Sequence, residues 1–227
     1  MTKMTERGVR LLVGIPCLDH WHAQFGMCLL NMCSMLHTRR VPGVRIESFT
    51  FHMTRSSLLQ KSRRQIIESA LERKFTHVLF IDSDQTFPSH TAHLMLSRNK
   101  AVVAANVPVK SLPSQPTARK FNPVYHGGDV VYTDPQSTGV ERVWRIGFGV
   151  MLIDMSIMDK LTKPWFKMEY DAEHNEDVGE DWFFCQRLEE AGIPIYIDHD
   201  VSQSVGHMGM LEFTHSYVGE VQKQEIA

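Results

Sequence analysis

Short apolar runs alternate with amphipathic stretches through the first half of the chain. The runs with the length and β-forming residues of strands are 10–15, 44–51, 78–81 and 101–106. The segments with apolar residues at helical spacing are 22–37, 56–74 and 89–98. Strands that alternate with helices predict an α/β fold with a doubly wound, mostly parallel sheet.

The pattern changes after Asn106, where prolines interrupt residues 107–123 and predict an irregular connection. Beyond it, the acid-rich residues 169–178 indicate a mobile loop. The other expected elements are a hairpin near Gly127–Asp129, a long strand Trp144–Ile153, a short helix Ser156–Leu161, a helix Glu180–Glu190 and a strand Ile195–Ile197. We therefore expect one domain over residues 1–227, with a nucleotide-type half (about 1–106) and a C-terminal elaboration (about 124–227).

The composition is that of an ordinary globular protein, with 43% hydrophobic and 22% charged residues in 227. The sequence has neither an apolar run of membrane-spanning length nor the apolar core of a signal peptide. The cysteines show no CxxC pairing and indicate reduced thiols. We expect a cytoplasmic protein without a membrane or protein partner. The four cysteines are Cys17, Cys28, Cys33 and Cys185.

The net charge of −2 conceals an uneven distribution. Residues 1–120 hold 17 Lys/Arg and 7 Asp/Glu, whereas residues 121–227 hold 7 and 19. A basic half could attract a polyanion. It could equally be a nucleotide-binding half that faces a half supplying acids for chemistry. Charge counting does not separate these two interpretations.

Two carboxylates, Asp82 and Asp84, directly follow the apolar run Val78–Ile81. A buried strand that ends in paired acids places them at its carboxyl end, where ligands bind in open α/β sheets. Carboxylates beside a phosphate-bearing substrate suit Mg²⁺ or Mn²⁺. Aspartates are equally common in turns and helix caps, here ahead of Pro88. The residues alone leave both interpretations open.

Several short motifs occur in an order that spans residues 11 to 210. They are Val13–Pro16, Arg63 with Ile66, Ile67, Ala70 and Leu71, Thr76–Asp84, Pro108–Lys110, Gly147–Gly149, Gly179–Phe184 and Gly206–Gly209. Each motif is weak alone, but their order resembles that of GT-A-type nucleotide-sugar glycosyltransferases, especially the small family-2-like enzymes encoded by bacteriophages. The resemblance implies a GT-A-like fold and, for a phage-encoded protein, the host cytoplasm.

The resemblance also implies a metal site. It assigns Asp84 as a ligand of Mn²⁺ or Mg²⁺, with Asp82 beside it as a further metal ligand and as a contact of the donor sugar or ribose. His207 would complete the metal site, and an imidazole is a tolerable Mn²⁺ ligand. The alternative for His207 is an ordinary surface or core histidine, one of 12 in the chain.

The donor implied by the resemblance is a nucleoside-diphosphate sugar, with a UDP-sugar as the first expectation. Arg63 would contact phosphate or ribose through its fork of donors, although Arg64 or a merely solvated helix face fits the pattern too. Backbone groups at Pro16 and Cys17 would cradle the base. The remaining donor-binding candidates are Ser83 and Lys110.

The acids Glu180 and Asp181 open the late helix, where acids are favoured by unpaired amides and the helix dipole. The resemblance makes Asp181 the general base that activates the acceptor hydroxyl, with Glu180 beside it. Trp182 would offer a flat face to the acceptor, and Gly149 would let backbone approach it. The implied reaction is a single displacement with inversion, although some enzymes of this fold retain configuration.

The acceptor is the least determined part of the hypothesis. Phage relatives that glycosylate DNA suggest a hydroxymethylated base such as 5-hydroxymethylcytosine, flipped out of the duplex. The basic residues that would hold the phosphate backbone are Arg39, Arg40, Arg45, Arg119 and Lys120. The alternatives are a saccharide or small-molecule acceptor, a sugar-phosphate nucleotidyltransferase and a non-catalytic binding module. The segment Pro16–His20 lacks the Gly-rich phosphate loop usual in nucleotidyltransferases.

Overall fold

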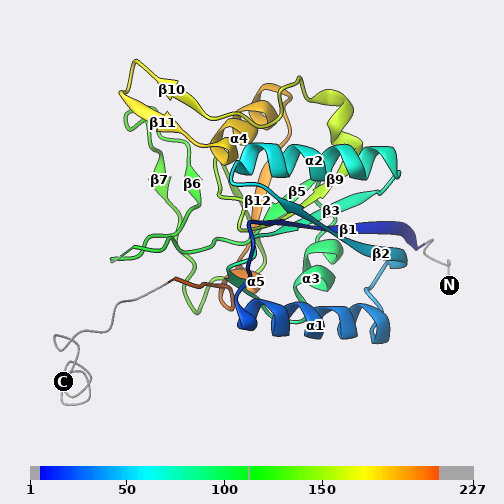
Figure 1. Cartoon of the computed structure of the whole chain (residues 1–227). Helices are drawn as coiled ribbons and strands as arrows, with labels where there is room; N and C mark the ends of the chain where they lie inside the picture. Colours follow the sequence, from blue (N-terminus) through cyan, green and yellow to red (C-terminus); the bar gives the residue numbers. More distant parts are fainter. Residues whose placement is uncertain (1–5, 112, 210–227) are drawn as a thin grey trace, which may run out of the picture.

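A computed structural model describes residues 6–111 and 113–209. One central sheet contains seven strands in the order β2–β1–β3–β9–β5–β12–β8 (Figure 1). Five of them run in one direction, whereas β8 and β9 run the opposite way. The prediction of a mostly parallel α/β sheet is therefore confirmed. The strands are β1 (Arg7–Cys17), β2 (Val44–Arg55), β3 (His77–Ile81), β5 (Val102–Ala104), β8 (Val140–Val143), β9 (Val150–Asp154) and β12 (Ile195–Asp198).

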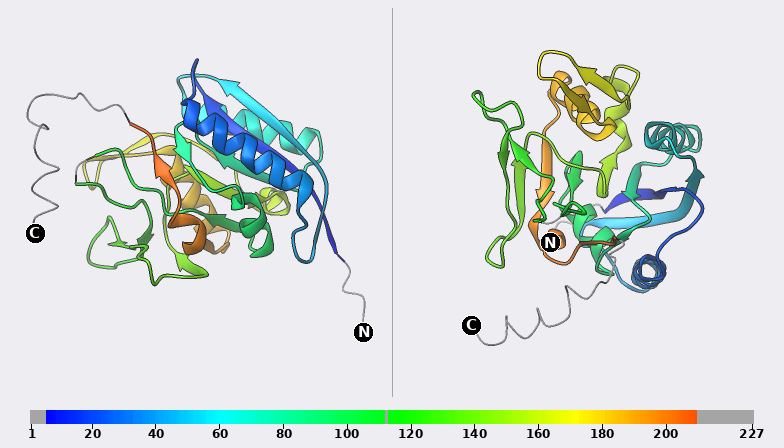
Figure 2. Two further views of the ribbon diagram at one scale, coloured as in Figure 1. Left: turned by 90° about the horizontal axis from the view of Figure 1, so that it is seen from below. Right: turned by 60° about the vertical axis from the view of Figure 1, so that its left-hand side comes forward.

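Helices cover both faces of this sheet (Figures 1 and 2). Alternate residues of β1 point to opposite faces, so Leu12 joins the core under α2 and α4 while Leu11 and Val13 join the core over α1 and α3. The predicted helices are confirmed with small shifts of their ends. The helices are α1 (Ala23–Thr38), α2 (Leu59–Glu72), α3 (Thr91–Ser97), the 3₁₀-helix η1 (Met155–Lys160), α4 (Glu180–Glu190) and α5 (His199–Ser202).

The predicted long strand Trp144–Ile153 is confirmed only in its last part, as β9, and is wrong over residues 144–149. Regular pairing begins only at Val150, and the chain before it is irregular as far as the end of the edge strand β8. Backbone around Gly147 and Gly149 is closely packed: a Cβ at Gly149 would lie 3.1 Å from Val107. Strand β9 is also inserted antiparallel between β3 and β5, which places Gly149 beside the end of β3.

Three short two-stranded ribbons border the sheet. The acidic stretch 169–178 forms the β-hairpin β10–β11, so its prediction as a loop is wrong, whereas the hairpin predicted near Gly127–Asp129 is confirmed by β6–β7. The ribbons are β4 (Gln85–Thr86) with β13 (Gly206–His207), β6 (Arg119–Lys120) with β7 (Asp129–Val130), and β10 (Glu169–Asp171) with β11 (Glu176–Val178).

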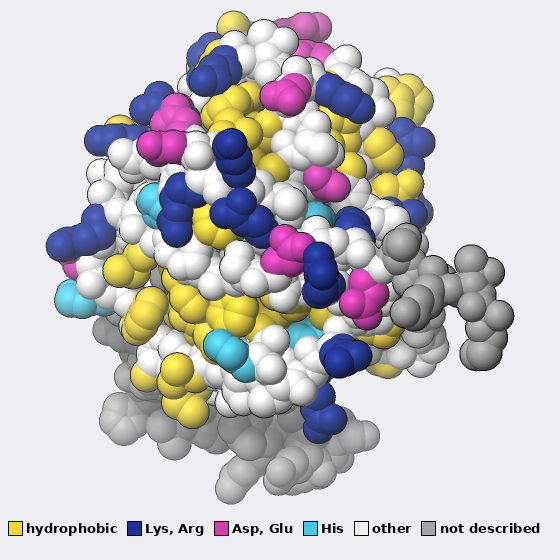
Figure 3. Space-filling model, turned by 90° about the vertical axis from the view of Figure 1, so that its right-hand side faces the viewer, with side chains coloured by type: hydrophobic (Ala, Val, Ile, Leu, Met, Phe, Trp, Pro, Cys, Tyr) yellow, Lys and Arg dark blue, Asp and Glu magenta, His cyan; other side chains and the backbone are white. Residues whose placement is uncertain are grey.

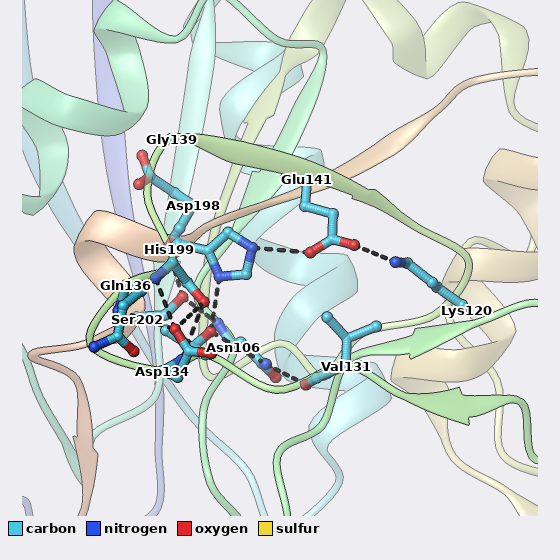
Figure 4. A network of polar contacts seen from close by, with 12 residues as sticks. Asn106, Lys120, Val131, Asp134, Gln136, Gly139, Glu141, Asp198, His199 and Ser202 are labelled. Atoms are coloured by element: carbon cyan, nitrogen blue, oxygen red, sulfur yellow. Dashed lines mark hydrogen bonds and ion pairs between the residues drawn. The ribbon is translucent and has the colours of Figure 1, made fainter.

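A buried polar network anchors the irregular connection after β5 (Figure 4). The Asn106 side chain donates to the Val131 carbonyl at 2.7 Å and accepts from the Ala118 amide at 2.9 Å. His199 lies between Glu141 and Thr133, at 2.9 and 3.0 Å. These bonds satisfy backbone groups that the loop would otherwise bury unpaired. The connection that carries Lys110 is thereby tied to α5 and β8.

All four cysteines are free thiols, as predicted. No helix within residues 6–111 and 113–209 combines the length and the apolar character needed to cross a bilayer. The histidine at position 215 lies outside the described residues.

Candidate functional site

A cavity of about 590 Å³ lies at the carboxyl ends of β1 and β3, where the sheet topology places ligands. It gathers most of the predicted site residues from seven separate segments of the chain. Glu180 and Trp182 do not line it. The predicted residues that do are Pro16, Cys17, Arg63, Asp82, Ser83, Asp84, Lys110, Gly149, Asp181 and His207.

Arg63 joins the two sides of the cavity. It is 2% exposed on α2, and its guanidinium donates to both oxygens of Asp82 at 3.1 and 3.3 Å. Its Nε donates to Glu180 at 3.1 Å. Burial, the largest influence, raises the pKa of Asp82, and the Arg63 guanidinium opposes that rise.

This arrangement bears on three of the expected roles. Because three donors of Arg63 already serve carboxylates, the side chain positions Asp82 and Glu180 rather than presenting an unoccupied fork to a phosphate. Both oxygens of Asp82 accept from the guanidinium, so any metal or donor contact of Asp82 would have to use the lone pairs that remain on these oxygens. Glu180 is buried against Arg63 and does not line the cavity, so the structure gives it a positioning contact, while its predicted catalytic role stays a prediction.

Asp84 lies between two nitrogen groups. Lys110 Nζ forms an ion pair with one carboxylate oxygen, and His207 Nε2 lies 3.4 Å from the other. Burial raises the pKa of Asp84, but the hydrogen bonds and charges of His207 and Lys110 outweigh it and hold that pKa well below its usual range. Asp84 is therefore an anion at any physiological pH.

The backbone holds Asp84 and His207 in register. His207 pairs with Gln85 in the β4–β13 ribbon, and the Met208 amide donates to the Asp84 carbonyl at 2.8 Å. The His207 Nδ1 donates to the Pro108 carbonyl at 2.9 Å, so in the neutral ring Nε2 carries the lone pair. A bond from the second ring nitrogen to a carbonyl is the usual support of a metal-binding histidine.

The Asp84–His207 pair fits a divalent cation. Two ligands at about 2.1 Å from one octahedral ion are roughly 3 Å apart, close to the observed 3.4 Å. One carboxylate and one imidazole suit Mn²⁺, while Mg²⁺ commonly takes one or two carboxylates plus substrate phosphates. Lys110 competes with the ion for Asp84 and would turn toward a bound anion when the ion is present.

Asp181 is half-buried at the cavity wall, in the first turn of α4. Its Oδ1 accepts from the Trp182 amide at 2.7 Å. Asp181 therefore also satisfies an unpaired amide at the start of the helix, as the structural interpretation of these acids predicted. Burial raises the pKa of Asp181, and the neighbouring Glu180 carboxylate raises it further. A carboxylate with a raised pKa is suited to accepting a proton near neutral pH.

The two residues predicted to contact the acceptor, Trp182 and Gly149, make their main contacts within the protein. Trp182 stacks under the Arg145 guanidinium, 4.7 Å from the ring centre, and does not reach the cavity. Gly149 lines the cavity, but the close approach that it permits is with Gln85 and Val107, whose side chains lie within 3.2 Å of the point where a Cβ would stand. Its carbonyl also accepts from the Asp82 amide at 2.9 Å.

The sequence did not indicate the wall formed by the connection between β2 and α2. The Ser56 amide donates to the Cys17 carbonyl at 3.3 Å, which sets this connection beside Pro16 and Cys17. This wall could have been inferred from the predicted parallel sheet. Parallel pairing of β1 with β2 brings the carboxyl ends of both strands to one edge, so the residues after β2 must lie near Pro16 and Cys17. Gly147, Phe148 and Val109, which belong to predicted motifs, line the cavity too, and the other unpredicted lining residues are Leu18, Ser57, Leu59, Gln85, Val107 and Thr117.

The basic residues predicted to hold DNA do not form one surface. Arg39 and Arg40 follow α1 and Arg45 begins β2, which places them at the amino ends of the strands, opposite the cavity. On that face Lys and Arg side chains lie among acidic and apolar ones (Figure 3). Arg119 donates to two backbone carbonyls, and Lys120 forms an ion pair with Glu141.

No protein-family model and no curated protein sequence matches the chain. Among solved structures, the chain is similar to A197 from STIV, with a TM-score of 0.52 and 14% sequence identity. The match covers 92% of this chain and 100% of that one. At this identity the likeness shows a shared fold.

Proposed function

We propose that the protein is a metal-dependent glycosyltransferase of GT-A-like fold, which moves a sugar from a nucleoside-diphosphate donor to an acceptor hydroxyl. The observation that carries the proposal is that one cavity contains Asp84 with His207, Lys110 and Asp181. These residues supply a metal pair, an anion-binding cation and a base. Its size lies within the range usual for small-molecule sites.

The donor diphosphate would lie beside Asp84 and His207, which would hold Mn²⁺ or Mg²⁺, and beside the ammonium of Lys110. The ion would neutralise the negative charge that develops on the departing diphosphate. The nucleoside would extend toward Pro16, Cys17 and the β2–α2 connection on the same cavity wall. A UDP-sugar is the donor that we would test first.

Asp181 would take the proton of the acceptor hydroxyl. The acceptor oxygen then forms a bond to the anomeric carbon as the bond from that carbon to the diphosphate oxygen breaks. The electron pair of the broken bond leaves with the nucleoside diphosphate. Attack from the face opposite the leaving group inverts the anomeric centre.

For the acceptor, the charge distribution favours a saccharide or another small hydroxyl compound over duplex DNA. Lys120 and Arg119 are engaged within the protein, and the arginines at positions 39, 40 and 45 lie at the far edge of the sheet. A hydroxymethylated DNA base is the second acceptor to be tested.

The test is a donor screen by thermal shift with UDP-, GDP-, TDP- and CMP-sugars, each with and without Mn²⁺. We expect one nucleotide class to raise the melting temperature in a Mn²⁺-dependent way, and donor hydrolysis or transfer to follow the same preference. Asp84→Ala should abolish both effects. Asp159→Ala is the matched control, because Asp159 is an exposed carboxylate remote from the cavity and should leave both unchanged.

Two results would count against the proposal. The first is full transfer by Asp84→Ala in the presence of a chelator. The second is formation of a nucleotide sugar from a sugar 1-phosphate and a nucleoside triphosphate, which would assign the cavity to nucleotidyl transfer instead.

A further inference from the structure

A second group of side chains of metal-ligating type lies between the β10–β11 hairpin and the connection from β6 to β7, and none of its residues lines the cavity. His126, Asp171 and His174 each offer one ligand atom, and these atoms all lie within 4.8 Å of one another. His174 Nδ1 is 2.9 Å from Asp171 Oδ2, and His126 Nε2 is 3.6 Å from the same oxygen. Glu176 Oε1 is 2.9 Å from His126 Nε2 and lies beside this group without belonging to the set of mutually close ligand atoms.

The hairpin itself brings two like charges together. Asp171 and Glu176 are direct cross-strand partners, an arrangement that is destabilising for two carboxylates unless a cation lies between them. One carboxylate oxygen of Asp171 stabilises the turn: Oδ1 accepts from the amides of Glu173 and His174 at 2.9 and 3.2 Å. Its Oδ2 remains directed at the two imidazoles.

One atom of the group and one of the adjacent Glu176 are buried without the bonds that they need. Among the described residues, His126 Nε2 and Glu176 Oε1 are shielded from solvent and have no hydrogen-bond partner, although only 2.9 Å separates them. Buried polar atoms of this kind usually indicate an ion or water that completes their bonding. The nearby Arg145 feels both carboxylates electrostatically, but its own Nε and Nη1 are unbonded, so it does not occupy their oxygens.

We propose that His126, Asp171 and His174 form a Zn²⁺ site, with Glu176, the neighbour of His126, as the carboxylate nearest to hand for a fourth ligand. Two imidazoles and two carboxylates suit zinc, whereas Mg²⁺ and Ca²⁺ prefer oxygen ligands alone. A tetrahedral ion at about 2.0–2.2 Å from each ligand separates neighbouring ligand atoms by roughly 3.3–3.6 Å. The observed separations of 2.9 and 3.6 Å lie near that range.

Binding requires one change in the histidine pair. The rings of His126 and His174 are stacked, with centroids 3.5 Å apart and planes inclined by 6°. Their nitrogen lone pairs therefore lie in two nearly parallel planes, and at least one ring must turn out of the stack for both to point at one ion. His174 is exposed and His126 half-buried, so this rotation disturbs little of the core.

The ion would fasten the β10–β11 hairpin to the connection between β6 and β7, from which His126 comes. Glu176 precedes Glu180 by four residues, so the fastened hairpin leads directly into the first turn of α4. The site shares no residue with the Asp84–His207 pair. The inference therefore does not depend on the proposed glycosyl transfer.

The test is zinc binding by the full-length, chelator-treated protein, measured by calorimetry and by the visible absorption of Co²⁺ as a substitute. We expect His126→Ala and His174→Ala each to weaken one Zn²⁺ equivalent by at least about 100-fold and to remove its contribution to the melting temperature. His20→Ala, at an exposed histidine outside the group, is the matched control and should bind Zn²⁺ as the wild type does.

Asp84→Ala and His207→Ala separate this ion from any ion in the cavity, because both variants should retain the hairpin equivalent. Circular dichroism of each histidine variant checks that the fold is kept. Unchanged zinc stoichiometry and affinity in the His126→Ala/His174→Ala double variant would overturn the assignment. So would a wild-type protein that binds no Zn²⁺ equivalent sensitive to these two histidines.

Discussion

At the residue scale, the buried Arg63 forms ion pairs with two carboxylates, Asp82 and Glu180. Its guanidinium compensates Asp82 and Glu180, which are otherwise enclosed by apolar side chains such as Phe148, whose ring centre is 4.5 Å from Arg63 Cζ. Removing one partner of a buried ionic group leaves charges uncompensated, which costs far more than losing a surface pair.

We expect Arg63→Met to lower the free energy of unfolding by about 3–5 kcal/mol, because the buried Glu180 and the partly buried Asp82 lose their cation. Urea denaturation at neutral pH measures this difference. Arg64→Met is the matched control: Arg64 is exposed and reaches Glu68 only at 3.8 Å, so its loss should cost less than about 1 kcal/mol. Equal costs for the two variants would contradict the assigned role of Arg63.

Asp181 is the second residue with a specific expectation. Asp181→Asn should bind the donor normally but lower the transfer rate by roughly 10²–10⁴-fold, since an amide accepts no proton. In the wild type the base works only when deprotonated. Because burial and Glu180 raise the pKa of Asp181, the rate should rise with pH through a midpoint above the ordinary aspartate value.

A pH–rate profile of donor turnover tests the second part of this expectation. Normal turnover in Asp181→Asn would move the base to another residue. If the rate rises with pH through a midpoint at the usual aspartate pKa, and no longer changes above it, the base is not desolvated during the reaction.

At the element scale, the site depends on how closely α2 approaches β1. Gly14 of β1 lies under Ile66 of α2, where a built Cβ would be only 2.5 Å from Ile66 Cγ2. Because Gly14 has no side chain, α2 can lie this close to the sheet. Arg63 is carried on the same helix, about one turn earlier.

We expect Gly14→Ala to destabilise the fold by about 1–3 kcal/mol through overpacking and to displace α2. Gly26→Ala is the matched control, since Gly26 lies within α1 and a Cβ there meets only Trp21 Nε1 at 3.8 Å. That change should stabilise by about 0.5–1 kcal/mol because alanine is the better helix former. Thermal unfolding of both variants distinguishes the outcomes, and a stabilising Gly14→Ala would refute the close packing.

The elements with strong local patterns could be predicted from the sequence, and those that depend on distant partners could not. Val78–Ile81 is a continuous apolar run bounded by polar residues, so its strand was evident. The direction of β9 is not encoded in its own residues, because its antiparallel insertion depends on the paths of its neighbours. The acids of 169–178 suggested a solvated loop, yet the turn with Asn175 at a φ of 55° closes a hairpin there.

The candidate site, like the fold, could be predicted only in part. The order of motifs brought Asp84, His207 and Asp181 forward as candidates, and the structure places all three on one cavity. The pairing of Arg63 with Asp82 and Glu180 was not visible, since residues 63 and 180 meet only through the packing of α2 against α4. The histidine group on the hairpin was missed because its members look like ordinary surface residues until β6–β7 and β10–β11 are adjacent.

At the scale of the whole molecule, the charge asymmetry of the sequence does not become one basic face. The arginines after α1 and at the start of β2 are separated from the cavity by the length of the sheet (Figure 1). A continuous surface that tracks phosphates next to a catalytic site is what DNA modification would require.

We expect retention on duplex DNA to be weak at low salt, lost near about 0.2 M salt, and equal for plain and hydroxymethylated duplexes. Arg39→Gln/Arg40→Gln should reduce retention on both duplexes alike, because these residues would make only sequence-independent phosphate contacts. Electrophoretic mobility shift over a salt series measures this. Selective, salt-resistant retention of the hydroxymethylated duplex would instead make DNA the acceptor.

The pairing of β4 with β13 has a consequence for the protein as it is synthesised. Asp84 and His207 are joined by backbone bonds across more than a hundred residues of intervening chain. On the ribosome, the sheet strands β1 to β3 are complete long before His207 has been translated. A nascent chain can therefore acquire part of its core while Asp84 and His207 are still apart. Loading of the proposed metal site would then have to wait until the segment around Met208 has been translated and has paired with the Asp84 backbone.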